Sequence, residues 1–136
     1  MLKQEVIKDN DQILAIILRS GDFPDGLNFY TKDQDFVQVS TWNYNVGKTT
    51  KPHAHKIAER SANRTQEVIY VKSGRMNMKI YNDKDEFFME TILESGDIAV
   101  IFAGGHSYEI LEDKTQILET KNGPYPGLEK DKKEIK

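Results

Sequence analysis

The chain has 136 residues and a net formal charge of −3, so we expect one domain without the basic face that binds nucleic acid. It contains no cysteine, which excludes disulfide bonds, thiolate metal ligands and cysteine nucleophiles. The apolar run 13–18 is too short to cross a membrane, and it lacks the cationic lead and cleavage site of a signal peptide. We therefore expect a cytoplasmic protein with neither a membrane nor a nucleic-acid partner.

Short strands account for nearly all of the expected secondary structure. No long segment has the apolar spacing of an amphipathic helix, whereas several short segments alternate or run apolar between turn residues. The expected strands are 12–19, 36–45, 49–55, 66–72, 75–81, 87–93, 97–102, 107–112 and 115–121. Glycine-bearing turns such as KSGR and ESGD separate some of them. This nearly even spacing predicts an all-β, single-domain antiparallel sandwich or β-barrel.

Two segments lack a clear strand pattern. Residues 20–35 are rich in Gly, Asp and Pro and are expected to form a loop, with room for one helical turn. The C-terminal tail, residues 123–136, holds two prolines and a charged end. Either the tail is partly disordered, or Tyr125 and Pro126 pack back onto the barrel or onto a partner subunit.

All three histidines lie near the ends of expected strands. His53 and His55 are two residues apart, so in a strand they project from the same face. Imidazoles commonly bind divalent transition metals, and a carboxylate often completes such a site. Glu67 begins an apolar strand, where a buried carboxylate needs a partner, and His106 follows a strand that ends in two glycines. The alternatives are exposed histidines in a polar strand and a Glu67 that reaches water.

The spacing of these residues resembles the first motif of the cupin superfamily, G-(x)5-H-x-H-(x)3–4-E-(x)6-G. Gly47, His53 and His55 match its first half, and Glu67 is followed by six residues and a glycine, as in its second half. Eleven residues, 56–66, separate the two halves, where the family usually has three or four. Glu59 lies at the usual distance from the histidines and is therefore an alternative ligand. We favour Glu67 because the strand and turn of the motif follow it.

The second cupin motif, G-(x)5-P-x-G-(x)2-H-(x)3-N, is matched in part. Gly96 opens it and Gly104 falls in place. Phe102 stands where the motif has proline, His106 arrives one residue early with Ser107 at the expected position, and the final asparagine is absent. A shift of one residue in a strand turns a side chain to the opposite face, so His106 needs a shortened turn to point inward.

The resemblance spans about residues 36–121, and it implies that residues 1–136 form a single small cupin domain, the double-stranded β-helix. It implies a divalent transition metal, either Fe, Mn, Zn, Ni or Co, in a site that keeps positions open for substrate or water. The implied ligands are His53, His55, Glu67 and His106. The resemblance also favours a homodimer, with the apolar run 13–18 either at its interface or buried in the core.

Other residues near this site are candidates for binding and catalysis. Gln38 and Trp42 share one face of the expected strand 36–45 and would line a pocket. Arg60 and Arg64 lie in the long loop, either as clamps for a phosphate or carboxylate or as solvated surface residues. His106 and Tyr108, two residues apart, are the candidate catalytic residues, although Tyr108 could equally be a barrel aromatic.

Residues 102–125 resemble the small cupins that accompany nucleotide-sugar and surface-polysaccharide pathways, through the sequences FAGGHSYEILED and ILETKNGPY. That resemblance implies a metal-binding protein that acts on a small polar molecule, as an isomerase or epimerase of a nucleotide-activated sugar. The alternatives are a dioxygenase that uses iron and a non-catalytic module that binds or senses a small-molecule ligand. Fold and ligand set do not separate these functions, because one fold hosts many chemistries.

Overall fold

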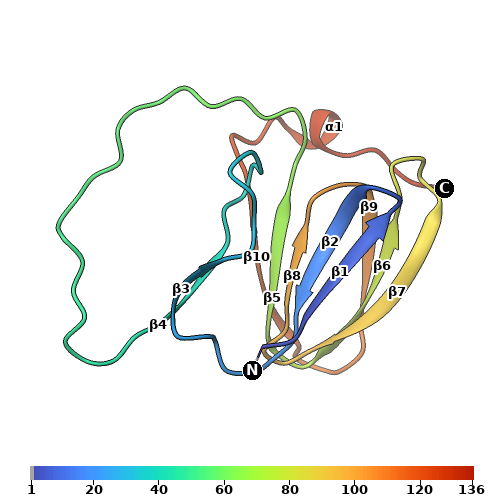
Figure 1. Cartoon of the computed structure of the whole chain (residues 1–136). Helices are drawn as coiled ribbons and strands as arrows, with labels where there is room; N and C mark the ends of the chain where they lie inside the picture. Colours follow the sequence, from blue (N-terminus) through green and yellow to red (C-terminus); the bar gives the residue numbers. More distant parts are fainter. Residues whose placement is uncertain (1) are drawn as a thin grey trace.

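The computed structural model describes residues 2–136, which are almost entirely antiparallel β-structure. The elements are β1 Gln4–Asp9, β2 Gln12–Leu18, β3 Gly26–Phe29, β4 Ser40–Asn43, β5 Glu67–Ser73, β6 Arg75–Tyr81, β7 Phe87–Glu94, β8 Ile98–Ile101, β9 Gly105–Ile110, β10 Gln116–Lys121 and the single-turn helix α1 Leu128–Asp131. They form a five-stranded sheet in the order β1-β2-β8-β5-β10, a three-stranded sheet β7-β6-β9 and a two-stranded sheet β3-β4 (Figure 1). The all-β class is confirmed, but none of the three sheets closes into the expected barrel.

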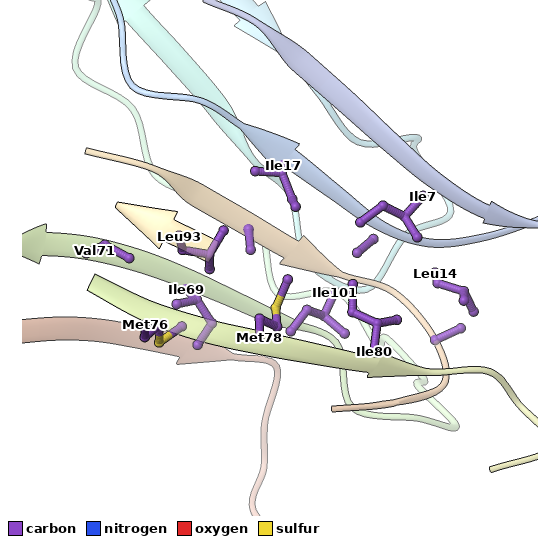
Figure 2. Packing of buried hydrophobic residues seen from close by; sticks show 13 residues of the cluster. Ile7, Leu14, Ile17, Ile69, Val71, Met76, Met78, Ile80, Leu93 and Ile101 are labelled. Atoms are coloured by element: carbon purple, nitrogen blue, oxygen red, sulfur yellow. The ribbon is translucent and has the colours of Figure 1, made fainter. Parts of the chain in front are cut away.

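The main core lies between the five-stranded and the three-stranded sheet. Strands β5 and β6 are joined by a tight turn and belong to different sheets, and each alternates buried with more exposed residues. Their inward residues are Ile69 and Val71 from β5, and Met76, Met78 and Ile80 from β6. Figure 2 shows these side chains in one cluster with residues of β1, β2, β7 and β8. The two methionines fill this core, as their alternation with polar residues predicts.

The apolar run 13–18 belongs to the core. Strand β2 lies between β1 and β8, so both of its edges are paired. Ile17 packs in the main core, whereas Ile16 and Leu18 point to the other face of the sheet. Side chains of residues 30–39 cover that outer face. A short, continuous apolar run is what a strand buried on both faces requires.

Two strands were not expected, and one is much shorter than expected. Strands β1 and β3 were not expected, and β3 lies within residues 20–35, which contain no helical turn. The expected strand 36–45 is reduced to the four residues of β4. β1 pairs with β2 and β3 pairs with β4, each in a local hairpin. The sequences of β1 and β3 alternate too weakly to predict a strand.

The expected strand 49–55 is wrong. Residues 44–66 contain neither helix nor strand, and they extend far from the sheets as one wide loop (Figure 1). Pro52 has no amide hydrogen to donate to a neighbouring strand. Val46 and Ile57 are the two aliphatic side chains larger than alanine in the loop, and both are fully exposed. The loop therefore buries too little apolar surface to offset the entropy lost on ordering it against a sheet.

Arg19 ties the N-terminal hairpin to the second half of the chain. Its guanidinium donates to Asp97 at 3.0 Å, to the carbonyl oxygen of Ile92 at 2.7 Å and to Glu5 at 3.1 Å. Asp97 is buried and also accepts the backbone N–H of Ser20 at 2.7 Å. Because hydrogen bonds between charged partners are stronger than neutral ones, this network stabilises the junction of β2, β7 and β8.

The Glu5→Gln variant is expected to lose stability at neutral pH and to match the wild type in acid. The side-chain hydrogen bond from Arg19 lowers the pKa of Glu5, against a smaller opposing effect of burial. A carboxylate whose pKa is lowered in the folded state contributes its full stabilisation above its pKa in the unfolded chain, which is about 4.3. This contribution disappears as the pH falls through the lower pKa of the folded state.

Urea unfolding from pH 7 to pH 3 measures this difference. The midpoints of wild type and Glu5→Gln should differ at pH 7 and converge below about pH 4. Glu59→Gln, in the exposed loop, is the matched control and should leave the curve unchanged. A gap between wild type and Glu5→Gln that stays constant down to pH 3 would contradict the assignment.

Candidate active site

Glu67 and His106 meet between the two large sheets. Glu67 is the first residue of β5 in the five-stranded sheet, and His106 is the second residue of β9 in the three-stranded sheet. The Nε2 atom of His106 lies 3.0 Å from Oε2 of Glu67, and the Glu67 side chain is only 7% exposed. The structure therefore joins two of the residues that the sequence nominates, although 38 positions separate them in the chain.

His106 points inward, despite arriving one residue early in the sequence motif. In the pairing of β6 with β9, Ile80 lies opposite His106 and Met78 lies opposite Tyr108. Residues directly opposite in an antiparallel pair share a face, and both Ile80 and Met78 are buried in the core. His106 and Tyr108 consequently face the core side of the sheet, where Glu67 is found.

The turn before β9 sets this register. Gly104 has a φ of 75°, which side chains rarely allow, and a Cβ atom there would collide with the carbonyl oxygen of Tyr81. The backbone N–H of Gly104 donates to Asp83 Oδ1 at 2.9 Å, in the turn between β6 and β7. The glycine thus allows the chain to reverse tightly against β6, and this shortened turn brings His106 to the inner face.

Glu67 is held as a carboxylate. Burial raises its pKa, but the contact with His106 and the charges of Lys121 and Lys132 together lower the pKa below its ordinary value. Lys121 lies opposite Glu67 in the pairing of β10 with β5, and its Nζ atom is 3.9 Å from Oε1. A buried carboxylate beside an imidazole fixes the orientation of the ring.

Three buried polar atoms, one each from Glu67, His106 and Tyr108, have no hydrogen-bond partner. Glu67 Oε2 is close to His106 but forms no well-aligned hydrogen bond, and His106 Nδ1 and the Tyr108 hydroxyl are buried without a partner. Buried polar atoms are nearly always satisfied in folded proteins, so each exception calls for an explanation. Because three such atoms lie close together, Glu67, His106 and Tyr108 are treated as the candidate site.

Tyr108 lies against His106. Their ring centroids are 5.0 Å apart and the ring planes are inclined by 32°. Burial raises the pKa of Tyr108 well above its ordinary value, and the negative charges of Glu67 and Glu119 raise it further. Its hydroxyl therefore stays protonated at physiological pH, so it can donate a hydrogen bond or a proton but cannot act as a base.

A wide cavity of about 2040 Å³ adjoins the three side chains. The loop before β5, the turn between β6 and β7, the start of β9 and the C-terminal tail line it, and nine carboxylates but only five Lys or Arg side chains lie along it. Its lining includes Glu67, His106, Tyr108, Gln38, Arg60 and Arg64. The excess of carboxylates gives no electrostatic attraction for a polyanion.

The other two predicted metal ligands lie elsewhere. His53 and His55 have their ring centroids 5.6 Å apart, but both are exposed in the loop 44–66, as is the alternative ligand Glu59. His53 Nδ1 lies 2.9 Å from the carbonyl oxygen of Lys51. Within residues 2–136, no group of three or more His, Cys, Asp or Glu side chains is placed to hold a metal ion. The arrangement thus supplies two of the four implied ligands together, and the four do not form a site as they stand.

The four residues predicted to bind substrate do not all line the cavity. Arg64 lines the cavity with Arg60, although its guanidinium lies 3.7 Å from Asp83 and so already has an acidic neighbour. The Gln38 side chain hydrogen-bonds to the backbone of its own loop, at 3.0 Å and 2.9 Å. Trp42 is 57% exposed, stacks edge-on against Tyr44 and does not line the cavity.

Sequence reasoning missed two residues of the site. Lys121 ends the last strand, and only the strand pairing places it opposite Glu67. Asp83 accepts hydrogen bonds from Gln12 and from the backbone of Gly104, and these contacts lower its pKa against a smaller effect of burial. The available signal for Asp83 was its position in a turn, YNDKDE, where acidic residues are common for local reasons.

Comparisons of this chain with protein-family models, with curated proteins and with solved structures gave no match. Among residues 2–136, the single-turn α1 is far from the length and apolar character that a membrane-crossing helix needs.

Proposed function

We propose that this protein is an enzyme that isomerises or epimerises a small polar molecule by moving a proton. The contact between the Glu67 carboxylate and the His106 imidazole, at the wall of a large cavity, carries the proposal. A histidine oriented by a carboxylate is a common arrangement for a general base or acid. With Nε2 turned toward Glu67, Nδ1 of the neutral ring is left as the proton-accepting nitrogen, and it has no partner within the protein.

Each of the three side chains has a distinct part in such a reaction. His106 would remove a proton from a carbon next to a carbonyl group of the ligand. Returning that proton to the neighbouring carbon would isomerise the ligand, and returning it to the opposite face of the same carbon, after the intermediate has turned in the cavity, would epimerise it. Glu67 would stabilise the imidazolium that forms in between, because its lowered pKa keeps it negative. The protonated Tyr108 hydroxyl would donate a hydrogen bond to the oxygen on which negative charge develops.

Two alternatives differ in the charge of the ligand. The resemblance to small cupins points to a nucleotide-activated sugar, with Arg60 and Arg64 on its phosphates. The nine carboxylates of the lining favour a neutral or cationic sugar or amine instead. We place the neutral or cationic ligand first, because Arg64 already lies near Asp83.

A thermal-shift screen followed by hydrogen exchange tests the proposal. The screen should hold neutral sugars, amino sugars and nucleotide-activated sugars, since a ligand that binds only the folded state raises its stability. The stabilising ligand is then incubated with the protein in deuterium oxide. Deuterium should enter the carbon next to the carbonyl group. A ligand that binds tightly yet takes up no deuterium would point to a non-catalytic binding or sensing module.

A second candidate is a metal-binding cupin, and the free edge of β9 favours it. In the sheet order β7-β6-β9, strand β9 has one partner within the described residues, so its outer edge is open. Strand edges readily accept a further strand. If residues 49–55 paired there, His53 and His55 would join the strand that carries His106, and the sheets would take the arrangement of a jelly roll.

Metal analysis of the full chain tests this candidate. The purified protein should hold close to one divalent metal ion per chain, and the His53→Ala, His55→Ala double variant should lose it. A wild type that stays metal-free after supplementation with Fe, Mn, Zn, Ni and Co contradicts the site. Oxygen uptake with Fe(II) and a stabilising ligand would identify the dioxygenase alternative.

We also propose a homodimer. Leu27, Phe29 and Trp42 lie on the β3-β4 hairpin with large exposed fractions, 44%, 61% and 57%. An isolated two-stranded sheet with exposed apolar side chains gains stability when a second surface covers it. Sedimentation of the wild type should give a dimer, and Trp42→Lys should shift it toward monomer.

A further inference from the structure

The C-terminal tail forms part of the wall of the cavity that Glu67 and His106 also line. Pro124, Pro126 and the run 129–135 all contribute to the cavity lining. Figure 1 shows α1 and the segment after it running over the end of the sheets at which β5 begins. Of the two residues that could pack back onto the domain, Pro126 lines the cavity and Tyr125 has a side chain that is 63% exposed. The contacts of the tail are made further along the chain.

Three side-chain contacts hold the tail in this position. Thr65 Oγ1 donates to Asp131 Oδ1 at 2.8 Å, and Lys133 Nζ donates to Asp85 Oδ2 at 2.8 Å. Ile135 packs directly over Gly105, because a Cβ atom on that glycine would collide with Cδ1 of the isoleucine. Gly105 is the residue before His106, so the last of these contacts covers the backbone beside the proposed base.

Side-chain contacts, and not backbone hydrogen bonds, attach the tail to the rest of the protein. From Gly123 onward, the backbone hydrogen bonds of the described chain are those within α1, from the N–H of Asp131 to Gly127 and from the N–H of Lys132 to Leu128. The ion pair of Lys133 is largely exposed, at 74% of the lysine side chain, and exposed ion pairs contribute little to stability. Release of the tail would therefore leave both sheets and the core intact.

We propose that residues 124–136 form a strap that closes over the Glu67–His106 site and opens to admit its ligand. The identity of that ligand rests on the proposed function, but the closure does not. Strap and site share the wall at Gly105, and the lack of a side chain there makes the space that Ile135 fills. With the strap in place the His106 side chain is 27% exposed, so the strap narrows the cavity and limits the access of water to a proton-transfer site, which strengthens its electrostatics.

The accessibility of His106 to diethyl pyrocarbonate, which modifies neutral imidazoles, tests the strap. The rate at each histidine is followed by mass spectrometry of the full-length protein at pH 7.5. Ile135→Ser is expected to raise the rate at His106 at least about threefold, because it removes the apolar contact that holds the strap closed. His53 and His55, exposed in the loop, serve as internal references and should react at unchanged rates.

Leu128→Ser is the matched control, since Leu128 lies on the same tail, is 64% exposed and does not line the cavity. It should leave the rate at His106 unchanged. A second variant that ends at residue 131 lacks both Lys133 and Ile135, and it should raise the rate at least as much as Ile135→Ser. Equal rates at His106 in the wild type and both strap variants would overturn the proposal. A faster rate without deuterium exchange would support the strap while contradicting the proposed reaction.

Discussion

Replacing His106 with asparagine is expected to slow deuterium exchange into the bound ligand by about 100- to 10,000-fold, the range typical for loss of a general base. Asparagine keeps a polar side chain of similar reach but cannot take up a proton at neutral pH. The ligand should still stabilise the variant in a thermal-shift assay, because the cavity walls remain. A fall in exchange without loss of binding separates a chemical role for His106 from a role in shaping the cavity.

The loop histidines provide the control for this result. His53→Asn makes the same chemical change in the exposed loop 44–66, and the proton-transfer proposal expects wild-type exchange from it. Equal losses in His53→Asn and His106→Asn would instead favour a metal site that includes both residues. Unchanged exchange in His106→Asn would contradict the assignment of His106 as the base.

Replacing Leu93 with alanine is expected to lower the free energy of unfolding by about 2–5 kcal/mol, which is the usual cost of truncating a buried leucine. Leu93 is fully buried in β7 and lies opposite Met76 of β6, within the core between the two large sheets (Figure 2). The cost has two parts, the lost burial of apolar surface and the cavity that remains. Urea unfolding followed by circular dichroism measures the change.

Leu118→Ala is the matched control for this measurement. Leu118 is 58% exposed on β10, at the edge of the five-stranded sheet, so its truncation should cost less than about 1 kcal/mol. Similar losses in the two variants would mean that the core does not lie between the sheets as described.

For Leu93→Ala, the flexible side chain of Met76 can move into part of the space that the leucine leaves. The expected loss of unfolding free energy therefore lies toward the lower half of the range.

The all-β class was readable from the sequence because the central strands alternate strongly. In β5 the inward positions hold Glu67, Ile69 and Val71, and in β6 they hold two methionines and an isoleucine. The tight turn between the two strands carries Gly74, whose φ of 92° requires a glycine. Where the pattern and the turn residue agree in this way, local sequence determines both the element and its boundaries.

The long loop shows where such reasoning fails. A strand over residues 49–55 would place His53 and His55, which are two residues apart, on one shared face. That spacing is also met by chance in polar segments, and the surrounding loop holds no apolar face that a sheet could bury. Strand formation depends on burial and on a partner edge more than on intrinsic preference. Neither can be seen within a window of seven residues.

The sequence predicted three residues of the candidate site but not the way in which they meet. Glu67, His106 and Tyr108 were each nominated from the sequence, yet their meeting depends on the way two sheets face each other. The inward direction of His106 depends on the reversal at Gly104, which a single shifted position in a motif does not reveal. Lys121 reaches Glu67 only through the pairing of the first and last strands of this half of the chain.

The wide loop also divides the polypeptide into two pieces that share one sheet. Residues 2–43 supply β1 and β2, whereas residues 67–136 supply β8, β5 and β10 of the same five strands. The junction is the antiparallel pair of β2 with β8, supported by Arg19 and by the apolar core on both faces. Residues 44–64 are exposed, so they contribute to that junction chiefly as a tether that keeps the two pieces close to each other. The fold is thus suited to fragment complementation, and foreign sequence placed in the loop would leave the hydrophobic interior undisturbed.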